Sequence, residues 1–311
     1  MTTATMPRTL GGHWLLQIAR DYAELTKLRV TTLIVMTAWC GFFFGAQKQG
    51  ISSLSWTLLH ALLGIGLVSS GTAALNEVME HEIDGHMRRT AMRPIPAGRM
   101  SVLHATIAGV LLSIGGSVYL AVFANVLTGA LTLLTSLVYL AAYTPLKRVS
   151  PVCTFVGAFP GAMPGVLGWT AVRNRLDWGT LVLFAILFLW QVPHFLSIAW
   201  LYREDYAAGG IRMLPVVESA GRGTAARILL YSLVLVPVSL LPTLLGMSGN
   251  LYLVGAALLS LVLFAVGARL TMLRAPVGSG ISKLRARQLL QATVIYLPLL
   301  FALMMTNAVH H

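Results

Sequence analysis

Three oxygen-bearing side chains recur at intervals of four residues in this chain, where Asn76, Glu80 and Asp84 follow a long apolar run. On an α-helix this spacing places all three on one face, about one turn apart. Carboxylate and amide oxygens suit Mg²⁺, and the arginines just downstream, among them Arg89 and Arg93, suit the free oxygens of a diphosphate. The pattern therefore predicts a magnesium site for an anionic substrate.

A solvated helix end, whose acids simply pair with the following arginines, is the alternative interpretation of this segment. Two observations favour a metal site. The chain has only ten Asp and Glu among 311 residues, and four of them lie within residues 77–84. Asn76 is also expected at membrane depth, where an amide needs a polar partner.

A second acidic pair, Glu204 and Asp205, follows a later apolar run. Alone, such a pair is typical of a surface contact with the adjacent Arg203. We expect it to face the same side of a membrane as the first cluster, because of the charge distribution described below. Carboxylates on two opposing helices can hold two Mg²⁺ ions that bridge one diphosphate.

Two further segments carry polar groups at or within apolar runs. Tyr143 and Lys147 are four residues apart at the end of one run, so both can face one anion, although topology alone also explains a basic residue there. His194 lies inside another run with Gln191 and Pro193. These residues predict a polar cavity, and a hydrogen bond to a neighbouring helix is the alternative role for His194.

The composition is that of a polytopic membrane protein. Hydrophobic residues make up 57% of the chain and charged residues 10%, whereas soluble globular proteins contain about 25% charged residues. The two cysteines lie in apolar runs and imply neither a disulfide framework nor a thiolate metal site. We expect no cleavable signal peptide. The net charge of +12 does not indicate nucleic-acid binding, because the basic residues occupy short loops between apolar runs.

Nine apolar stretches are long enough to cross a bilayer as helices. They predict an all-α bundle that forms a single membrane domain over residues 1–311. We place the spans at about 30–46, 55–76, 102–123, 126–143, 152–172, 178–200, 226–246, 250–272 and 288–308. The fifth contains Pro160, Pro164 and four glycines, so we expect it to be kinked and to pack closely on its neighbours.

Most of the 22 Lys and Arg lie at one end of these spans if the N-terminus is inside. This bias predicts a cytoplasmic N-terminal segment, 1–28, and a C-terminus outside. It also places the acidic loops 77–101 and 201–225 together on the cytoplasmic side. Because these loops follow the second and sixth spans, the chain also suggests two structurally related halves.

These motifs resemble those of the UbiA-type intramembrane prenyltransferases, and within them those of the haem O synthases. The first superfamily motif is Asn-x3-Asp-x3-Asp, which Asn76, Glu80 and Asp84 match with Glu in the middle, as in the haem O synthases. Other segments similar to that subfamily are DGHMRRTAMRPIPAGR, YTPLKR, WQVPHF, REDY with GGIRMLP, and YLP. Together they span most of the chain.

Two positions depart from the family pattern. Leu28 stands where the family has a proline before the first span. Asp205 matches the second Asp of the superfamily's second motif, Asp-x3-Asp, but Leu201 stands at the place of the first. The second metal motif is therefore incomplete, and Glu204 is the residue that could compensate.

The resemblance implies a UbiA-type helical bundle in the bacterial cytoplasmic (inner) membrane. The implied reaction is transfer of farnesyl from farnesyl diphosphate to a vinyl group of haem B, which gives haem O for terminal oxidase assembly. Membrane lipid, haem A synthase and a terminal oxidase are the implied surroundings and partners. The implied catalytic residues and Mg²⁺ ligands are Asn76, Glu80, Asp84 and Asp205; the diphosphate contacts are Arg89, Arg93, Lys147, Arg212 and Tyr143; the haem contacts are His194 and Gln191.

Two other functions stay open at this point. A related prenyltransferase for another aromatic or tetrapyrrole acceptor would share the acidic motif, but we expect it to lack the combination of DGHMRRTAMRP and WQVPHF. A cation-coupled transporter would carry its charges near the middle of the bilayer, whereas the acids here cluster at one membrane face.

Overall fold

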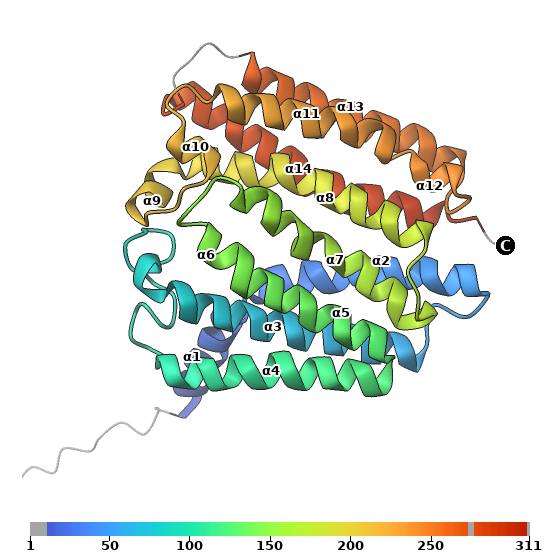
Figure 1. Cartoon of the computed structure of the whole chain (residues 1–311), viewed down its shortest axis with the longest axis horizontal. Helices are drawn as coiled ribbons and strands as arrows, with labels where there is room; N and C mark the ends of the chain where they lie inside the picture. The colour runs from blue at the N-terminus through green and yellow to red at the C-terminus, as the bar shows by residue number, and fades with distance from the viewer. Residues whose placement is uncertain (1–10, 273–276, 310–311) are drawn as a thin grey trace, which may run out of the picture.

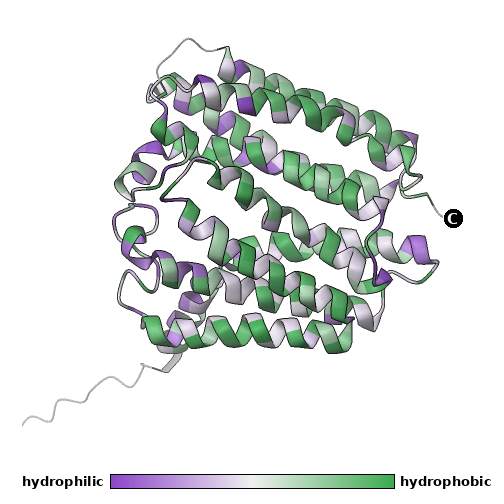
Figure 2. Ribbon diagram, viewed as in Figure 1, coloured by the Kyte–Doolittle hydropathy of each residue, from purple (hydrophilic) through white to green (hydrophobic). Residues whose placement is uncertain are grey.

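The computed structural model describes residues 11–272 and 277–309, so the first ten residues of the predicted N-terminal segment lie outside it. The described residues contain nine helices that are long and apolar enough to cross a membrane, as predicted. These helices lie side by side in one bundle (Figure 1). Hydrophilic residues gather mainly at the helix ends and in the connecting loops, and apolar residues cover the length of the helices (Figure 2).

The membrane helices have boundaries close to the predicted ones. They are α2 (Leu28–Gln49), α3 (Trp56–Asp84), α4 (Val102–Phe123), α5 (Val126–Leu137) continued by the π-helix η1 (Val138–Tyr143) and α6 (Thr144–Leu146), α7 (Cys153–Arg173), α8 (Trp178–Leu201), α11 (Arg222–Val238) followed by α12 (Leu241–Leu244), α13 (Asn250–Thr271) and α14 (Gly280–Thr306). The short helices α9 (Arg203–Ala208) and α10 (Leu214–Val217) lie between α8 and α11. The largest differences are at the end of α3 and the start of α14, where polar turns extend the helix and a search for apolar runs does not detect them.

The helix α1 (Gly11–Leu25) precedes the first span and was not predicted, because an amphipathic helix contains no long apolar run. Its buried Leu25 packs in a small cluster with Ala74 of α3 and with residues near the start of α4. Arg99 links the same region, since its guanidinium bonds Asp21 at 2.8 Å and Glu24 at 2.9 Å. The helix therefore rests against the end of α3 that carries the acidic motif.

Helix α7 is the most deeply buried of the membrane helices in the described part of the chain. It approaches α2 so closely that a Cβ at Gly41 would collide with the carbonyl oxygen of Gly165, and one at Gly168 with that of Ala38. Small residues permit such contact between membrane helices. The close packing predicted for the fifth span is thus confirmed, and Pro160 lies inside a helix that continues to Arg173.

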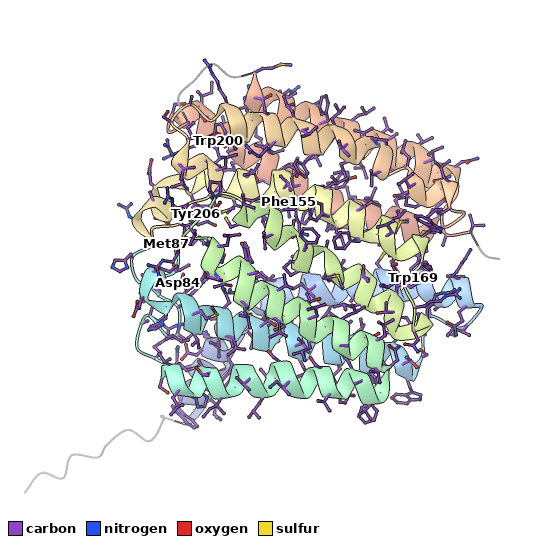
Figure 3. All side chains as sticks on the ribbon, in the orientation of Figure 1. Asp84, Met87, Phe155, Trp169, Trp200 and Tyr206 are labelled. Carbon is purple, nitrogen blue, oxygen red and sulfur yellow. The ribbon has the colours of Figure 1, made fainter. Side chains whose placement is uncertain are left out.

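The two acidic loops lie at the same end of the bundle. Met87 of the first loop shares a buried apolar cluster with Ile211 and Met213 of the second and with Tyr143 at the end of η1. The backbone N–H of Arg212 also donates to the carbonyl of residue 147 at 2.7 Å. In Figure 3 the side chains of Asp84, Met87 and Tyr206 lie at the end of the bundle opposite Trp169.

Candidate functional site

One face of α3 carries the three oxygen-bearing side chains, as their spacing predicted. The helix continues without a break to Asp84, so Asn76, Glu80 and Asp84 stay in helical register. All three are buried, with 0%, 7% and 1% of their surfaces exposed. The Asn76 side-chain amide donates to Glu80 Oε2 at 2.9 Å and to Thr144 Oγ1 at 3.1 Å. The polar face is therefore shielded from water along its length.

Each of these side chains also meets a cationic group from another segment. Lys147 Nζ lies 2.8 Å from Glu80 Oε1 and 3.1 Å from Oε2. Arg93 Nη1 lies 2.5 Å from Asp84 Oδ2, and a third cation contacts Asn76. Buried charges are tolerated only when they are paired. The site is thus an alternation of oxygen ligands and cations, which is the chemistry that a metal diphosphate requires.

The third cation is Lys27, which the sequence analysis did not assign to the site. Its Nζ donates to Asn76 Oδ1 at 2.5 Å. The residue lies at the break between α1 and α2 in the left-handed region, with φ 47° and ψ 50°, a backbone conformation that costs a non-glycine residue about 1 kcal/mol or more. The available sequence signal was its position directly before the first span, at the membrane face predicted for Asn76 as well.

The pKa values of the two buried lysines, Lys27 and Lys147, shift in opposite directions. Burial, together with the charges of Arg93 and Lys147, lowers the pKa of Lys27 to about 7. Burial also disfavours the charge of Lys147, but Tyr143, Tyr139 and Glu80 outweigh it and raise the pKa of Lys147 above its ordinary value. The difference follows from the surroundings, because nearby positive charges oppose a charge on Lys27, whereas the groups around Lys147 favour its charge.

Glu77 is a second residue whose role the sequence did not reveal. It lies next to Asn76 and is fully buried, with none of its surface exposed. Its Oε1 accepts a hydrogen bond from the backbone N–H of Ile95 at 3.2 Å, while Oε2 has no partner among the described residues. Glu77 therefore fixes the loop that carries Arg93 onto the helix that carries Asp84.

The predicted diphosphate contacts divide into two groups. Arg93 and Lys147 point at the acids of α3, and Lys147 Nζ also lies 4.6 Å from the centre of the Tyr143 ring. Arg89 instead lies over two tyrosine rings of the second acidic loop, 5.7 Å from the centre of one and 5.8 Å from the other. Arg212 is exposed. The structure therefore brings two of the five predicted contacts, Arg93 and Lys147, directly to α3, and Tyr143 lies against Lys147.

The second acidic segment is more open than the first. Glu204 is mostly exposed and pairs with Lys283 at 2.8 Å. The half-buried Asp205 carboxylate has no hydrogen-bond or ion-pair partner in the described ranges. Helix α8 ends at Leu201, so Asp205 belongs to the separate short helix α9. Over residues 11–272 and 277–309, no three His, Cys, Asp or Glu side chains converge on one point, and Asp205 is not gathered with the α3 acids.

His194 and Gln191 contact neighbouring helices. His194 Nδ1 lies 2.9 Å from Thr293 Oγ1 of α14, and its ring stacks on Trp190 with 4.7 Å between ring centres. The amide nitrogen of Gln191 donates to the carbonyl of Ala158 on α7 at 3.3 Å. The helix–helix hydrogen bond considered for His194 is therefore present, and its Nε2 is the nitrogen left for another ligand.

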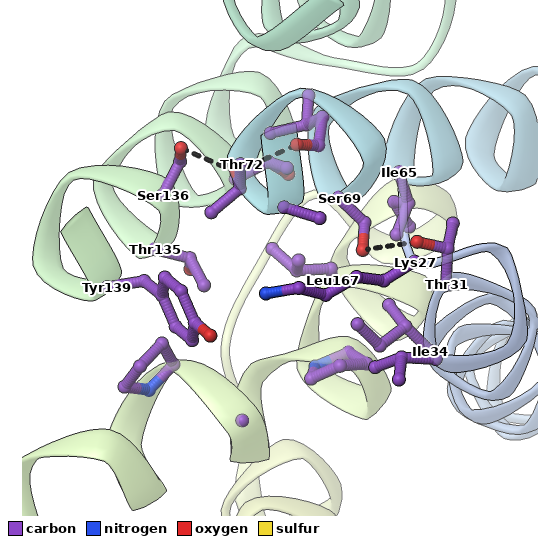
Figure 4. A pocket seen from close by; sticks show the side chains of 17 residues that line it. Lys27, Thr31, Ile34, Ile65, Ser69, Thr72, Thr135, Ser136, Tyr139 and Leu167 are labelled. Atoms are coloured by element: carbon purple, nitrogen blue, oxygen red, sulfur yellow. Dashed lines mark hydrogen bonds between the residues drawn. The ribbon is translucent and has the colours of Figure 1, made fainter. Parts of the chain in front are cut away.

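A largely apolar cavity lies beside the polar face of α3 (Figure 4). Lys27 reaches into it, and its walls come from α2, α3, α5, η1 and α7. Several hydroxyl groups line it but bond to one another, as in the pairs Thr72–Ser136 at 2.7 Å and Thr31–Ser69 at 3.4 Å. The cavity therefore offers an apolar channel that begins at the charged site.

The sequence is similar to those of known proteins along nearly its whole length. Over 99% of each chain, the protein is 57% identical to a Koribacter versatilis protein named protoheme IX farnesyltransferase. A Solibacter usitatus protein of the same name is 50% identical, over 93% of this chain and 98% of its own.

Solved structures show the same fold at lower identity. A digeranylgeranylglyceryl phosphate synthase structure matches with a TM-score of 0.70 and 17% identity, covering 93% of this chain and 98% of its own. A UbiA homolog from Archaeoglobus fulgidus, bound to GPP and Mg²⁺, matches with a TM-score of 0.57 and 16% identity over 91% and 99% of the two chains. The model of the UbiA prenyltransferase family matches residues 34–287. The chain belongs to the UbiA prenyltransferase family.

Proposed function

We propose that this prenyltransferase moves the farnesyl group of farnesyl diphosphate to a vinyl group of haem B and so produces haem O. The similarity to proteins named protoheme IX farnesyltransferase over nearly the whole chain supports this acceptor and donor. The observation that carries the chemistry is the buried row of oxygens and cations on α3 beside an apolar cavity. Such a site can hold a charged head and an apolar tail at once.

The donor set on α3 fits Mg²⁺, because it offers only oxygen ligands on one buried helix face. Asn76, Glu80 and Asp84 would hold the ion, and Asp205 would contribute from the opposite loop. When bound, Mg²⁺ would neutralise part of the diphosphate charge and so make the diphosphate a better leaving group. A UbiA homolog of known structure binds GPP and Mg²⁺, which supports this assignment.

The cations of the site would stabilise the leaving diphosphate. As the allylic C–O bond breaks, negative charge grows on the diphosphate oxygens. Lys147 and Arg93 already lie within bonding distance of the α3 carboxylates and can share their protons with those oxygens. Groups fixed in advance, in a site with little water, contribute most to such stabilisation. Arg89, Arg212 and Tyr143 would complete the diphosphate site.

The apolar cavity would protect the other product of this bond cleavage. The farnesyl tail would lie along the cavity, so that its allylic carbocation meets few water molecules before the acceptor arrives. The vinyl π electrons of haem B would then form the new carbon–carbon bond. Water would add to the resulting cation and lose a proton, which leaves a hydroxyethylfarnesyl side chain.

Haem is assigned to His194, with Gln191 nearby, on the helix that leads to the second acidic loop. Nδ1 of His194 is engaged by Thr293, which fixes the ring and directs Nε2 elsewhere. Imidazole is a frequent ligand of haem iron.

We also propose that the chain forms a single domain in a bacterial inner membrane, with the N-terminus and both acidic loops on the cytoplasmic side. The proposed partner is haem A synthase or a terminal oxidase assembly.

The test is to incubate the purified protein in lipid nanodiscs with haem B, farnesyl diphosphate and Mg²⁺, and to measure the mass of the haem. We expect the mass to rise by one farnesyl group plus one hydroxyl group. The Glu80→Gln variant is the matched control and should leave haem B unmodified. A parallel incubation with an aromatic quinone precursor tests the acceptor: modification of that compound, with unmodified haem, would overturn the proposal.

A further inference from the structure

We propose that the cavity beside α3 has a closed end, formed by Ile65 and Leu167, and that the depth of this end selects a prenyl chain of three isoprene units. The inference rests on the proposed function and extends it to substrate length. It assigns specificity to apolar residues far along the helices from the charged site.

The first observation is the register of α3. Ile65, Ser69 and Thr72 line the cavity, and they precede Asn76 by eleven, seven and four residues. Residues at these intervals lie on one helix face, so a single stripe runs from the charged site to Ile65. Eleven residues at 1.5 Å per residue span about 16 Å. This is the order of length of an extended farnesyl chain.

The second observation is that packed side chains line the end of the cavity away from the charged site. Ile65 is 1% exposed and Leu167 is 3% exposed, and both belong to one buried cluster with Ala38. Ile34 of α2 lines the same end of the cavity and packs against that cluster. A chain longer than the cavity would have to displace these side chains.

The third observation is that the backbone around this floor cannot move apart easily. Close to Ile34 on α2, and on both sides of Leu167 on α7, the two helices touch at Ala38 with Gly168 and at Gly41 with Gly165. These are backbone contacts with no side chain between them. The floor side chains therefore rest on a rigid helix crossing, and chain length should respond to the size of the floor residues.

The serine and threonine groups of the walls give the chain no polar register. Their hydroxyls bond to other protein atoms: Thr135 donates to the carbonyl of Leu131 at 2.6 Å and Thr132 to that of Thr128 at 2.6 Å. An isoprenoid chain would thus slide freely until it met the floor. Depth alone would then decide which diphosphate places its reactive carbon beside Asn76.

The experiment compares kcat/KM for geranyl, farnesyl and geranylgeranyl diphosphate with haem B as acceptor. Ile65→Ala and Leu167→Ala deepen the cavity and should raise the geranylgeranyl-to-farnesyl ratio by about tenfold, the effect expected for a few methylene groups in an apolar pocket. Ser69→Phe should act in the opposite direction, because it fills the cavity two turns from Asn76 and favours the geranyl substrate. Leu263→Ala truncates a buried leucine of α13 outside the cavity and should leave both ratios unchanged.

Unchanged ratios in the two deepened variants would overturn the inference, as would an equal change in Leu263→Ala. If the alanine variants do not accumulate, Ile65→Val and Leu167→Val test the same point with a smaller shift in the same direction. Binding separates this inference from the proposed function. Protection against thermal unfolding by each diphosphate reports chain-length preference even if wild-type protein leaves haem unmodified.

Discussion

The two acidic segments of this protein both follow a membrane span at the same end of the bundle, but they differ in structure. In the first, Asn76, Glu80 and Asp84 are buried on one helix face, and each meets a cation from elsewhere in the chain. In the second, Glu204 is mostly exposed beside Lys283, and Asp205 has no partner in the described residues. In the first segment the fold therefore pairs every oxygen-bearing side chain of the motif with a basic residue. In the second segment the Asp205 carboxylate is left without a partner among the described residues.

The difference shows that a count of acids does not reveal which acids are organised. The α3 acids keep a helical interval and lie where three loops supply cations. The second segment lacks an acid at Leu201, and the helix ends there, so Asp205 is presented by a short separate turn. We infer that the first segment provides most of the metal affinity and that the second closes the site around the substrate.

The strongest test of this comparison is to remove charge from the first segment. Glu80→Gln and Asp84→Asn should each reduce kcat by at least about 10²–10³-fold, the usual effect of losing a group that stabilises transition-state charge. Glu80→Gln also leaves Lys147 buried without its carboxylate, which we expect to lower stability by about 3 kcal/mol. Turnover at limiting Mg²⁺ and thermal unfolding measure both effects. Near-normal turnover at limiting Mg²⁺ would remove that residue from the metal site.

The next test asks whether the second segment takes part in the same site. Asp205→Asn should reduce turnover by about 10²-fold, yet it should leave the unfolding temperature unchanged, because the carboxylate has no partner among the described residues. This separation of activity from stability distinguishes Asp205 from Glu80. Wild-type turnover in Asp205→Asn, measured under the same limiting Mg²⁺, would confine the metal site to α3.

A smaller effect is expected on α8, which leads into the second segment. His194→Ala should lose the bond to Thr293 and about 1 kcal/mol of stability, the typical value for a hydrogen bond between membrane helices. If His194 also contacts haem, the absorption spectrum of the bound haem should change while farnesyl diphosphate binding persists. A lower melting temperature with an unchanged haem spectrum would assign His194 to helix packing alone.

The smallest effect is expected for the other acid of the second segment. Glu204→Gln should change turnover less than about twofold, since surface ion pairs contribute little and this carboxylate is mostly exposed. Glu204→Gln is also the matched control for Asp205→Asn, because it neutralises the adjacent carboxylate. A loss as large as that of Asp205→Asn would mean that Glu204 compensates for Leu201, and the second segment would then hold two working carboxylates.

The sequence predicted the parts of this molecule that follow from periodicity and composition. All nine spans and the shared face of Asn76, Glu80 and Asp84 are confirmed, because both depend on local spacing. Lys27 and Glu77 were missed, since their roles depend on contacts between distant segments: one with Asn76, the other with the backbone of Ile95.

The amphipathic α1 was not predicted for a different reason. A search for continuous apolar runs does not detect a helix that is apolar on one face only. The lack of a partner for the Asp205 carboxylate among the described residues could not be predicted either. A carboxylate in an acidic loop has the same sequence signature whether or not a cation from another loop reaches it.

The glycine crossing of α2 and α7 has a consequence for how the protein is made. The face of α2 that contains Gly41 touches a helix four spans later in the chain, so it stays uncovered while α3, α4 and α5 are synthesised. During that interval the membrane holds an early helix without its closest partner. We therefore expect fragments that end before α7 to be substrates for proteolytic quality control, and those that extend to Arg173 to persist.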